Sequence, residues 1–414
     1  MNFWKTSFWA LIAAVTRLCS QFFIAKIIAV FAGTAAFGIF GQFISFVNLI
    51  QLGSGGAVSG GVTKYVSEYH NSKQQLITLI ETAIKFAFYA SLITGMLIAI
   101  FCIPLSSYIF QSYHYWWLLL VFGLTLFGYT LNQIFLSIFN GLNQMRIYTL
   151  MSFYSAIFSV ILIGLLTFYY TTDGALLGFV LSQLCLLVVA TFYIKKLPVQ
   201  IRFISSSIEN SELKKLLKFS LMAITSAIVL PLFQIFIRGY VSYFSSWETV
   251  GLWQAIIRIS DGYLLILTLI ISTYALPKYA RTSSKKELKQ EVFSLLLKLT
   301  PVACLFATLV FLFKYYIILI LFSEKFLAME NLFLFQLVGD VFKVMAWCIG
   351  TAFLAKAKIK AYITVEISIV SIMTFLSVLL FHFFGVIGLT IAFAITQALH
   401  FVLNLCLFLR NIYK

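Results

Sequence analysis

The stretch from Trp116 to Phe139, WWLLLVFGLTLFGYTLNQIFLSIF, contains no charged residue and decides the fold class. A helix needs about 20 consecutive apolar residues to cross the hydrocarbon core of a bilayer, and this stretch is long enough. The strands of a membrane β-barrel would alternate in polarity over segments of about ten residues. Here the hydrophobic residues run continuously, so the stretch predicts a transmembrane helix.

Similar stretches fill the rest of the chain. Hydrophobic residues make up 62% of it and charged residues 10%, and its mean hydropathy is +1.02. Soluble domains carry about 25% charged residues, so lipid must surround most of this protein. We predict an all-α integral membrane protein with about 12 transmembrane helices, in two pseudo-symmetric six-helix lobes around a central cationic cavity. The expected spans are 7–31, 37–60, 80–104, 116–139, 147–170, 173–194, 216–242, 249–277, 292–320, 329–355, 361–383 and 385–408.

Lysines and arginines concentrate in alternate loops. The loops of one side include the basic segments 195–215 and 278–291, whereas the only cation of the opposite loops is Lys325. The positive-inside rule places the basic loops and both termini in the cytoplasm. The net charge of +16 therefore reflects membrane topology, and no nucleic-acid partner is expected. The six cysteines and four histidines lack metal-ligand spacing, so neither a metal nor another cofactor is expected.

The two halves of the chain align with an offset of about 213 residues, and such repeats are common in transporters. The segment GIFGQ at 38–42 resembles GLWQ at 251–254, for example. Six spans per half is an even number, so the repeats run parallel and their axis lies along the membrane normal. The expected lobes are residues 1–200 and 201–414.

Charged residues inside the expected spans are mostly cationic. Such charges are costly in lipid and usually face a cavity or a partner. An excess of cations predicts an anionic ligand, and phosphate or pyrophosphate suits the planar donors of arginine and the point charge of lysine. The expected pyrophosphate-binding residues are Arg17, Lys26, Lys85, Arg238, Arg258, Lys298 and Lys343.

Two polar stripes follow the helical repeat, with residues at i, i+4 and i+7 on one face of a helix. They are Gln254, Arg258 and Asp261, and Gln336, Asp340 and Lys343. Two interpretations stay open: the stripes line a water-filled space, or the i, i+3 charges within each stripe pair and pin their helices. The candidates for contacting sugar or for coupling to ions are Gln21, Gln42, Asn48, Gln254, Asp261, Gln336, Asp340 and Glu366. The acids among them, Asp261, Asp340 and Glu366, are candidates to carry protons or sodium ions, since the chain has no nucleotide-binding motif.

Several segments resemble a known family. They are GVTKYV at 61–66, GLWQ at 251–254 with ISD at 259–261, and QLVGDV at 336–341. These segments resemble Wzx-type flippases, which include O-antigen translocases and enterobacterial common antigen flippases, and the resemblance covers essentially the whole chain. It implies the MATE-like fold of the MOP exporter superfamily.

The same resemblance implies a function. The implied substrate is an undecaprenyl-pyrophosphate-linked oligosaccharide, moved from the cytoplasmic to the periplasmic leaflet of a bacterial inner membrane by alternating access. Membrane lipids are expected partners, and a polysaccharide polymerase and a chain-length regulator are candidate protein partners. Two alternatives are weighed against this function. A MATE-like drug exporter should have an acid-rich cavity, and a membrane sugar transferase or polymerase should have large loops with paired carboxylates. Neither feature is found, so we predict a transporter and not an enzyme.

Overall fold

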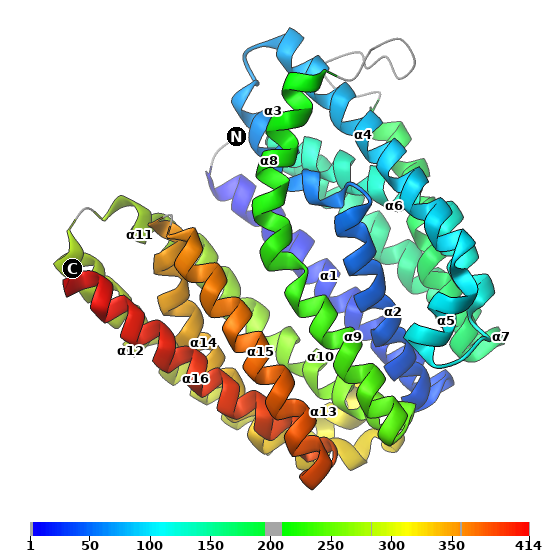
Figure 1. The fold of residues 1–414 in the computed structure, drawn as a ribbon, viewed down its shortest axis with the longest axis vertical. Helices are drawn as coiled ribbons and strands as arrows, with labels where there is room; N and C mark the ends of the chain where they lie inside the picture. The colour runs from blue at the N-terminus through cyan, green and yellow to red at the C-terminus, as the bar shows by residue number, and fades with distance from the viewer. Residues whose placement is uncertain (1–2, 195–208, 283, 357, 414) are drawn as a thin grey trace. The chain divides into compact units, whose positions relative to one another are not determined.

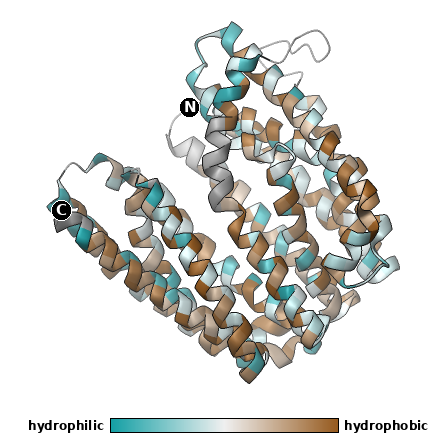
Figure 2. Ribbon diagram, viewed as in Figure 1, coloured by the Kyte–Doolittle hydropathy of each residue, from teal (hydrophilic) through white to brown (hydrophobic). Residues whose placement is uncertain are grey.

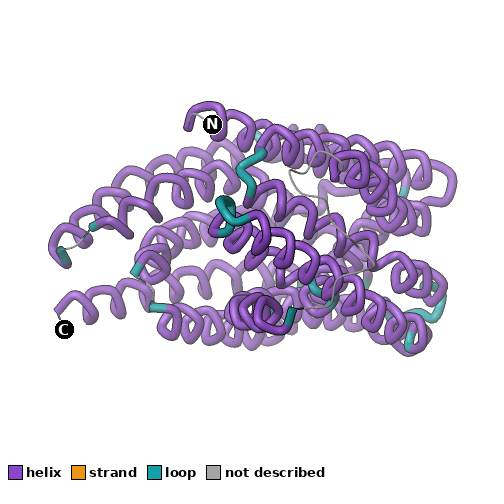
Figure 3. The backbone as a smooth tube through the Cα atoms, turned by 90° about the horizontal axis from the view of Figure 1, so that it is seen from above, coloured by secondary structure: helices purple, strands orange, loops and turns teal. Residues whose placement is uncertain are grey.

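The computed structural model describes residues 3–194, 209–282, 284–356 and 358–413 (Figure 1). These residues are almost entirely helical and include no strand (Figure 3). The elements in chain order are α1 (Phe3–Phe31), α2 (Gly33–Gly53), a 3-10 turn (Gly56–Val58), α3 (Ser59–Glu68), α4 (Lys73–Ile100), α5 (Cys102–Phe110), α6 (Trp116–Gly141), α7 (Met145–Ile194), α8 (Asn210–Ala227), α9 (Val229–Phe244), α10 (Trp247–Ile270), a π-helical turn (Ile271–Ala275), α11 (Leu276–Arg281), α12 (Lys285–Leu312), α13 (Lys314–Leu321), a 3-10 segment (Glu324–Leu332), α14 (Phe333–Ala355), α15 (Ile359–Phe384) and α16 (Val386–Tyr413).

Among the described residues, ten helical stretches are long and apolar enough to cross a membrane. One of them, α7, contains two helical segments joined at a kink, and α8 with α9 covers the expected span 216–242. If α7 is counted as two spans, and α8 with α9 as one more, the described residues contain the predicted total of about 12 spans. The hydrophobic colours of Figure 2 follow the middle of the helices, and the hydrophilic colours gather towards their ends. The all-α membrane fold is thus confirmed.

A tight turn at Thr171 divides α7. The backbone there has φ 50° and ψ −120°, so the helix breaks and the chain turns back on itself. The two segments pack closely, because a Cβ added at Gly174 would lie 1.8 Å from the carbonyl oxygen of Leu166. The hydroxyl of Ser159 donates to the hydroxyl of Ser182 at 3.2 Å, on opposite arms of the hairpin. The expected spans 147–170 and 173–194 are therefore an antiparallel helical hairpin.

The same hairpin recurs between α15 and α16. Gly385 adopts φ 58° and ψ −143°, and a Cβ added at Gly388 would lie 2.1 Å from the carbonyl oxygen of Leu380. The two turns lie 214 residues apart (385 minus 171). This spacing agrees with the offset that the sequence predicts for an internal repeat.

The lengths of other helices repeat as well. Helices α4 and α12 both have 28 residues, and their first residues lie 212 positions apart (285 minus 73). Each is followed by a short helix, α5 and α13 respectively. The repeat therefore includes the order and length of the helices, and not only scattered residue matches.

The chain divides into two compact units. The first ends at Ile235 and the second begins at Phe236. In the first unit, α3, α4 and α6 share a core that contains Val62, Leu79 and Phe139, all fully buried. In the second unit, α11, α12 and α14 share a core that contains Val292 and Val344, both fully buried. The expected boundary between lobes, at residues 200 and 201, lies outside the described residues, as does most of the basic segment 195–215.

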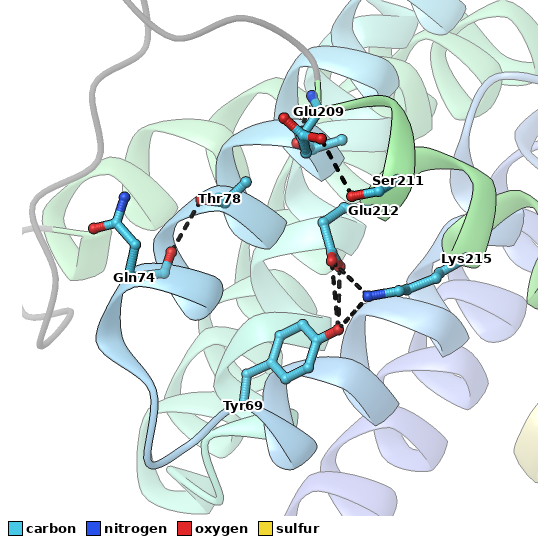
Figure 4. Close-up of polar contacts among 8 residues, drawn as sticks. Tyr69, Gln74, Thr78, Glu209, Ser211, Glu212 and Lys215 are labelled. Atoms are coloured by element: carbon cyan, nitrogen blue, oxygen red, sulfur yellow. Dashed lines mark hydrogen bonds and ion pairs between the residues drawn. The ribbon is translucent and has the colours of Figure 1, made fainter.

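The first turn of α8 is attached to the end of α3 in the first unit (Figure 4). The ammonium of Lys215 lies 2.7 Å from the buried carboxylate of Glu212 and donates to the hydroxyl of Tyr69 at 2.8 Å. The hydrogen bond to Glu212, followed by the one to Tyr69, raises the pKa of Lys215 above its ordinary value. Lys215 therefore stays charged throughout the physiological range, and the contact holds α8 to a segment more than a hundred positions earlier in the chain.

We expect Gly174→Val to destabilise the protein by more than about 3 kcal/mol, because a side chain there overlaps the backbone of the facing helix. The apparent melting temperature of the purified protein in detergent measures this effect. Gly164→Ala is the matched control in the same helix, since a Cβ there meets only the flexible end of Ile27 at 3.4 Å. Equal melting temperatures for the two variants would contradict the close approach described above.

Candidate functional site

Polar side chains of α9, α10 and α14 gather inside the second unit. All of these helices are otherwise apolar, and α10 and α14 pack against one another. The group is called the α10–α14 polar cluster below. Its members are Arg238, Gln254, Arg258, Asp261, Tyr263, Gln336, Asp340 and Lys343.

Arg238 is the most deeply buried cation of the cluster, with 1% of its surface exposed. Its guanidinium donates from Nη2 to Oε1 of Gln254 at 2.5 Å. The charges of Arg258 and Asp261 act on it electrostatically. Gln254 and Arg258 lie one helical turn apart on α10, so the stripe predicted from the sequence brings an amide acceptor and a second cation to the same arginine.

Lys343 joins α14 to α10. Its ammonium lies 4.0 Å from Oδ1 of Asp261, whose side chain is 57% exposed. The same ammonium lies 5.0 Å from the ring centroid of Trp347 and 5.8 Å from that of Phe393, within the range of cation–π attraction. The ion pair of Lys343 therefore runs between helices rather than to Asp340, which lies three residues earlier on the same helix.

Asp340 is fully buried. The hydroxyl of Tyr263 donates to Oδ2 at 2.7 Å, and the amide of Gln336 donates to Oδ1 at 3.5 Å. Across the described residues, no basic nitrogen lies within ion-pair distance of this carboxyl. Asp340 is thus held by neutral donors, in contrast to Asp261.

Glu366 lies outside the cluster, between α15 and α16. Its carboxylate lies 3.9 Å from Nε2 of His400. His400 is buried, with Nδ1 3.4 Å from Oε1 of Gln397. The coupling candidate Glu366 therefore belongs to a second, separate polar group of the same unit.

The first unit contains the remaining candidates except Lys298. Arg17 is exposed on α1 and lies within electrostatic range of Tyr129 on α6. The amide of Gln42 donates to the carbonyl oxygens of Ile109 and Ile235 at 3.1 and 3.2 Å, so it holds three helices together. The other candidates of this unit lie on α1, α2 and α4; they are Gln21, Lys26, Asn48 and Lys85. Lys298 lies in the second unit, exposed on α12.

Several residues of these groups could not be found from the sequence. Tyr263 bonds Asp340, but it lies off the polar stripe of α10 and carries no charge. His400 is a single histidine in an apolar helix, a pattern typical of ordinary buried histidines. Trp347 and Phe393 are two of many aromatic residues, and only the fold places them beside Lys343.

The cluster combines anion-binding and proton-binding chemistry. Its cations are Arg238, Arg258 and Lys343, and its acids are Asp261 and Asp340, so it has an excess of one positive charge when both acids are ionised. Arginine and lysine donors suit phosphate oxygens. Two carboxyls in different surroundings can hold protons to different degrees.

The solved structures that resemble this chain include MATE transporters of the MOP superfamily. An inward-facing multidrug-resistance MATE transporter has a TM-score of 0.79 at 14% identity, and the match covers 97% of this chain and 98% of that one. A Vibrio cholerae MATE transporter has a TM-score of 0.69 at 15% identity, covering 99% of this chain and 96% of that one. The predicted MATE-like fold is therefore confirmed, and this chain is a multi-pass membrane protein of that fold.

The sequence comparisons narrow this class to a family. The family model described as polysaccharide biosynthesis protein matches residues 3–283. The chain belongs to that family. Lipid III flippases of Escherichia coli K12 and Shigella flexneri are each 29% identical to it over 415 aligned residues, which cover 99% of this chain and 99% of theirs. Flippases and MATE proteins are transporters rather than enzymes, in agreement with the class predicted from the sequence.

We expect Gln254→Leu to destabilise the protein by about 1–3 kcal/mol, because it removes the acceptor of a buried guanidinium. The apparent melting temperature in detergent reports the change. Asn48→Leu, which removes an exposed amide on α2, is the control and should melt like the wild type. A Gln254→Leu protein as stable as this control would show that the bond to Arg238 contributes nothing to the fold.

Proposed function

We propose that this protein is a flippase for a lipid-linked oligosaccharide. It moves an undecaprenyl-pyrophosphate-linked repeat unit, of the O-antigen or enterobacterial common antigen type, from the cytoplasmic to the periplasmic leaflet by alternating access. The observation that carries the proposal is the cationic α10–α14 polar cluster, placed among membrane-spanning helices of a chain in the polysaccharide biosynthesis protein family. The full-length similarity to lipid III flippases supports the substrate class.

The pyrophosphate is the part of such a substrate that the cluster suits. Arg258 and Lys343 are partly buried and lie beside the more exposed Asp261, so they are the cations of the cluster nearest to water. An anionic ligand would replace Asp261 as the partner of Lys343 and add a partner for Arg258. Arg238 is more deeply buried and contacts the same helix, α10, through its hydrogen bond to Gln254. The remaining cations proposed for the pyrophosphate path are Arg17, Lys26, Lys85 and Lys298.

Amide side chains are suited to the sugar. Gln254 and Gln336 are buried and bonded to Arg238 and Asp340, so their role is to hold the charged side chains. Gln21 and Asn48 are exposed and are the better sugar candidates. We assign this secondary role to amides because they offer both donors and acceptors to hydroxyl groups.

The topology forms part of the same proposal. We place both termini in the cytoplasm of a bacterium and the protein in its inner membrane, on the basis of the one-sided distribution of loop cations. The two six-helix lobes, residues 1–200 and 201–414, would move against each other to expose the substrate alternately to each leaflet. The recurring hairpins at Thr171 and Gly385 support a two-fold repeat.

Two other functions are less well supported. A drug exporter that binds cations would require an excess of acids at its site, whereas the α10–α14 polar cluster has an excess of cations. A polymerase or sugar transferase would require paired catalytic carboxylates exposed to water, whereas only one of the cluster's two acids, Asp261, is exposed and Asp340 is fully buried.

Complementation tests the function. The chain is expressed in Escherichia coli that lacks its lipid III flippase, and surface polysaccharide is read by gel. We expect enterobacterial common antigen to be restored. If it is not, the experiment is repeated in strains without an O-antigen flippase that express the matching sugar-assembly enzymes. Failure in all of these strains, with the protein present in the membrane, would contradict the proposed function.

The same assay tests the cationic site. Arg258→Gln should lower the rate of polysaccharide export by about 10- to 100-fold, the effect of losing one charge-assisted contact of about 1.5–3 kcal/mol. Lys286→Ala, which removes an exposed cation at the start of α12, is the matched control and should leave export unchanged. Both proteins are first shown by immunoblot to be equally abundant in the membrane. Unchanged export by Arg258→Gln would exclude Arg258 from the site.

A further inference from the structure

A neutral polar stripe runs along α6 in the first unit, although this helix has no charged residue. Its members share one face of the helix, at i, i+4, i+8 and i+12, and all are partly exposed; they are Thr125, Tyr129, Gln133 and Ser137. On the other side of α6, Ile134 and Ile138 are fully buried in the core of the unit. The stripe is therefore called the α6 stripe below, and it lies on the side of the helix that the core does not use.

Two members of the α6 stripe are satisfied by their own helix. The hydroxyl of Thr125 donates to the carbonyl oxygen of Val121 at 2.9 Å, and that of Ser137 donates to the carbonyl oxygen of Gln133 at 2.9 Å. Polar groups of this kind inside a span usually serve a contact between helices or a ligand. Tyr129 and Gln133 have the longer side chains, so they are the members of the stripe that can reach a ligand.

A cation lies near the α6 stripe, on α1. Arg17 is exposed and acts electrostatically on Tyr129, and Gln21, one turn further along α1, is exposed as well. The sequences of α1, α2 and α6 contain no acidic residue. The surroundings of Tyr129 thus offer a guanidinium, amides and a hydroxyl. Such a set suits an anion that carries hydroxyl groups, and it does not suit a cation.

The internal repeat gives a second, independent observation. Helix α6 ends at Gly141 and α14 at Ala355, 214 positions apart (355 minus 141), which is the offset of the hairpins. At this offset Tyr129 corresponds to Lys343, and Gln133 to Trp347. Lys343 belongs to the α10–α14 polar cluster, and its ammonium lies 5.0 Å from the ring centroid of Trp347. The same face of the repeated helix therefore carries interacting groups in both units, charged in the second and neutral in the first.

We infer that Tyr129 and Gln133 form a sugar-recognition site in the first unit. This inference rests on the proposed function and adds two residues to the path of the substrate. The site binds the hydroxyl groups of the oligosaccharide, and Arg17 is the cation beside it that suits the pyrophosphate. The repeated scaffold then presents the chemistry of an anion site in one unit and that of a carbohydrate site in the other.

The two side chains suit a carbohydrate for different reasons. The amide of Gln133 has two donor hydrogens and an acceptor oxygen, which match neighbouring hydroxyl groups of a sugar ring. Tyr129 combines an apolar ring with a polar hydroxyl, so it can pack against the C–H groups of a sugar and bond to it at the ring's edge. A site of this kind discriminates between sugars, because a hydroxyl that is absent leaves a polar group of the protein without a partner.

Two other uses of the pair fit the observations less well. The prenyl chain of the substrate is entirely apolar and would leave the amide and the phenol without hydrogen bonds. A structural contact that pins α1 to α6 would be a requirement of the fold, and both copies of the repeat would then need similar groups. The second unit instead has a lysine and a tryptophan at these positions.

Lipid binding to the purified full-length protein in detergent tests the inference. Native mass spectrometry compares undecaprenyl pyrophosphate, which has no sugar, with the undecaprenyl-pyrophosphate-linked oligosaccharide that accumulates in the flippase-deficient strain that the chain complements. The wild type should bind the second lipid about tenfold more tightly, because sugar hydroxyls gain partners. Gln133→Leu should lose about fivefold to tenfold in affinity for the oligosaccharide-linked lipid and should keep its affinity for undecaprenyl pyrophosphate.

Further variants keep the test decisive. Tyr129→Phe removes the hydroxyl but keeps the ring, should weaken the oligosaccharide-linked lipid by about threefold to tenfold, and serves if Gln133→Leu does not fold. Gln74→Leu, the same substitution at an exposed residue of α4, is the matched control and should bind both lipids like the wild type. Arg17→Gln should weaken both lipids alike, because both contain the pyrophosphate. In the complementation assay, Gln133→Leu should match the wild type in abundance and lower export about fivefold to tenfold.

The outcomes separate this inference from the proposed function. Unchanged affinity of Gln133→Leu and Tyr129→Phe for the oligosaccharide-linked lipid would overturn the site and leave the flippase function standing. Equal losses for both lipids, together with a lower melting temperature, would show a structural role and overturn it as well. Equal binding of the two lipids by the wild type would overturn sugar recognition but not the anion site. Absence of binding of either lipid would contradict the proposed function, and the sugar site with it.

Discussion

Polar groups inside a hydrocarbon layer must find their partners within the protein, and this constraint shapes the whole structure. For the backbone, it leaves helices as the element of an apolar chain. For side chains, it means that each charge is held by a neighbour. Arg238 is held by Gln254, Lys343 by Asp261 and two aromatic rings, and Asp340 by Tyr263. The α10–α14 polar cluster exists because none of these groups can be left alone among apolar helices.

Much of the fold could be predicted because the constraint acts locally. A run such as Trp116–Phe139 has one structure available in lipid, so the spans and their order follow from hydropathy. The polar stripes of α10 and α14 were also predictable, because helical spacing decides which residues share a face. Partners on other helices were not predictable in this way. The choice of Lys343 between Asp340 and Asp261, and the role of Tyr263, depend on the packing of α10 against α14.

The repeat shows which features the fold itself requires. A glycine follows the turn of both hairpins at Gly174 and Gly388, where a side chain would overlap the facing backbone. At the first turn, Thr171 adopts a positive φ that Gly385 reaches at no cost in the second. The close approach of the two arms thus depends on the small residue after the turn. A glycine at the turn itself is not required.

Two charged residues of the cluster are not repeated in the first half, although the backbone is. At the offset of the hairpins, 214 residues, Asp340 corresponds to Leu126 and Lys343 to Tyr129, so two apolar or neutral positions of the first half hold an acid and a base in the second. A feature needed for folding should be present in both copies, since both fold alike. A feature present in one copy is free of that requirement, and its cost in lipid must be balanced by a use. The asymmetry therefore separates the α10–α14 polar cluster from the repeated scaffold that both halves need for folding.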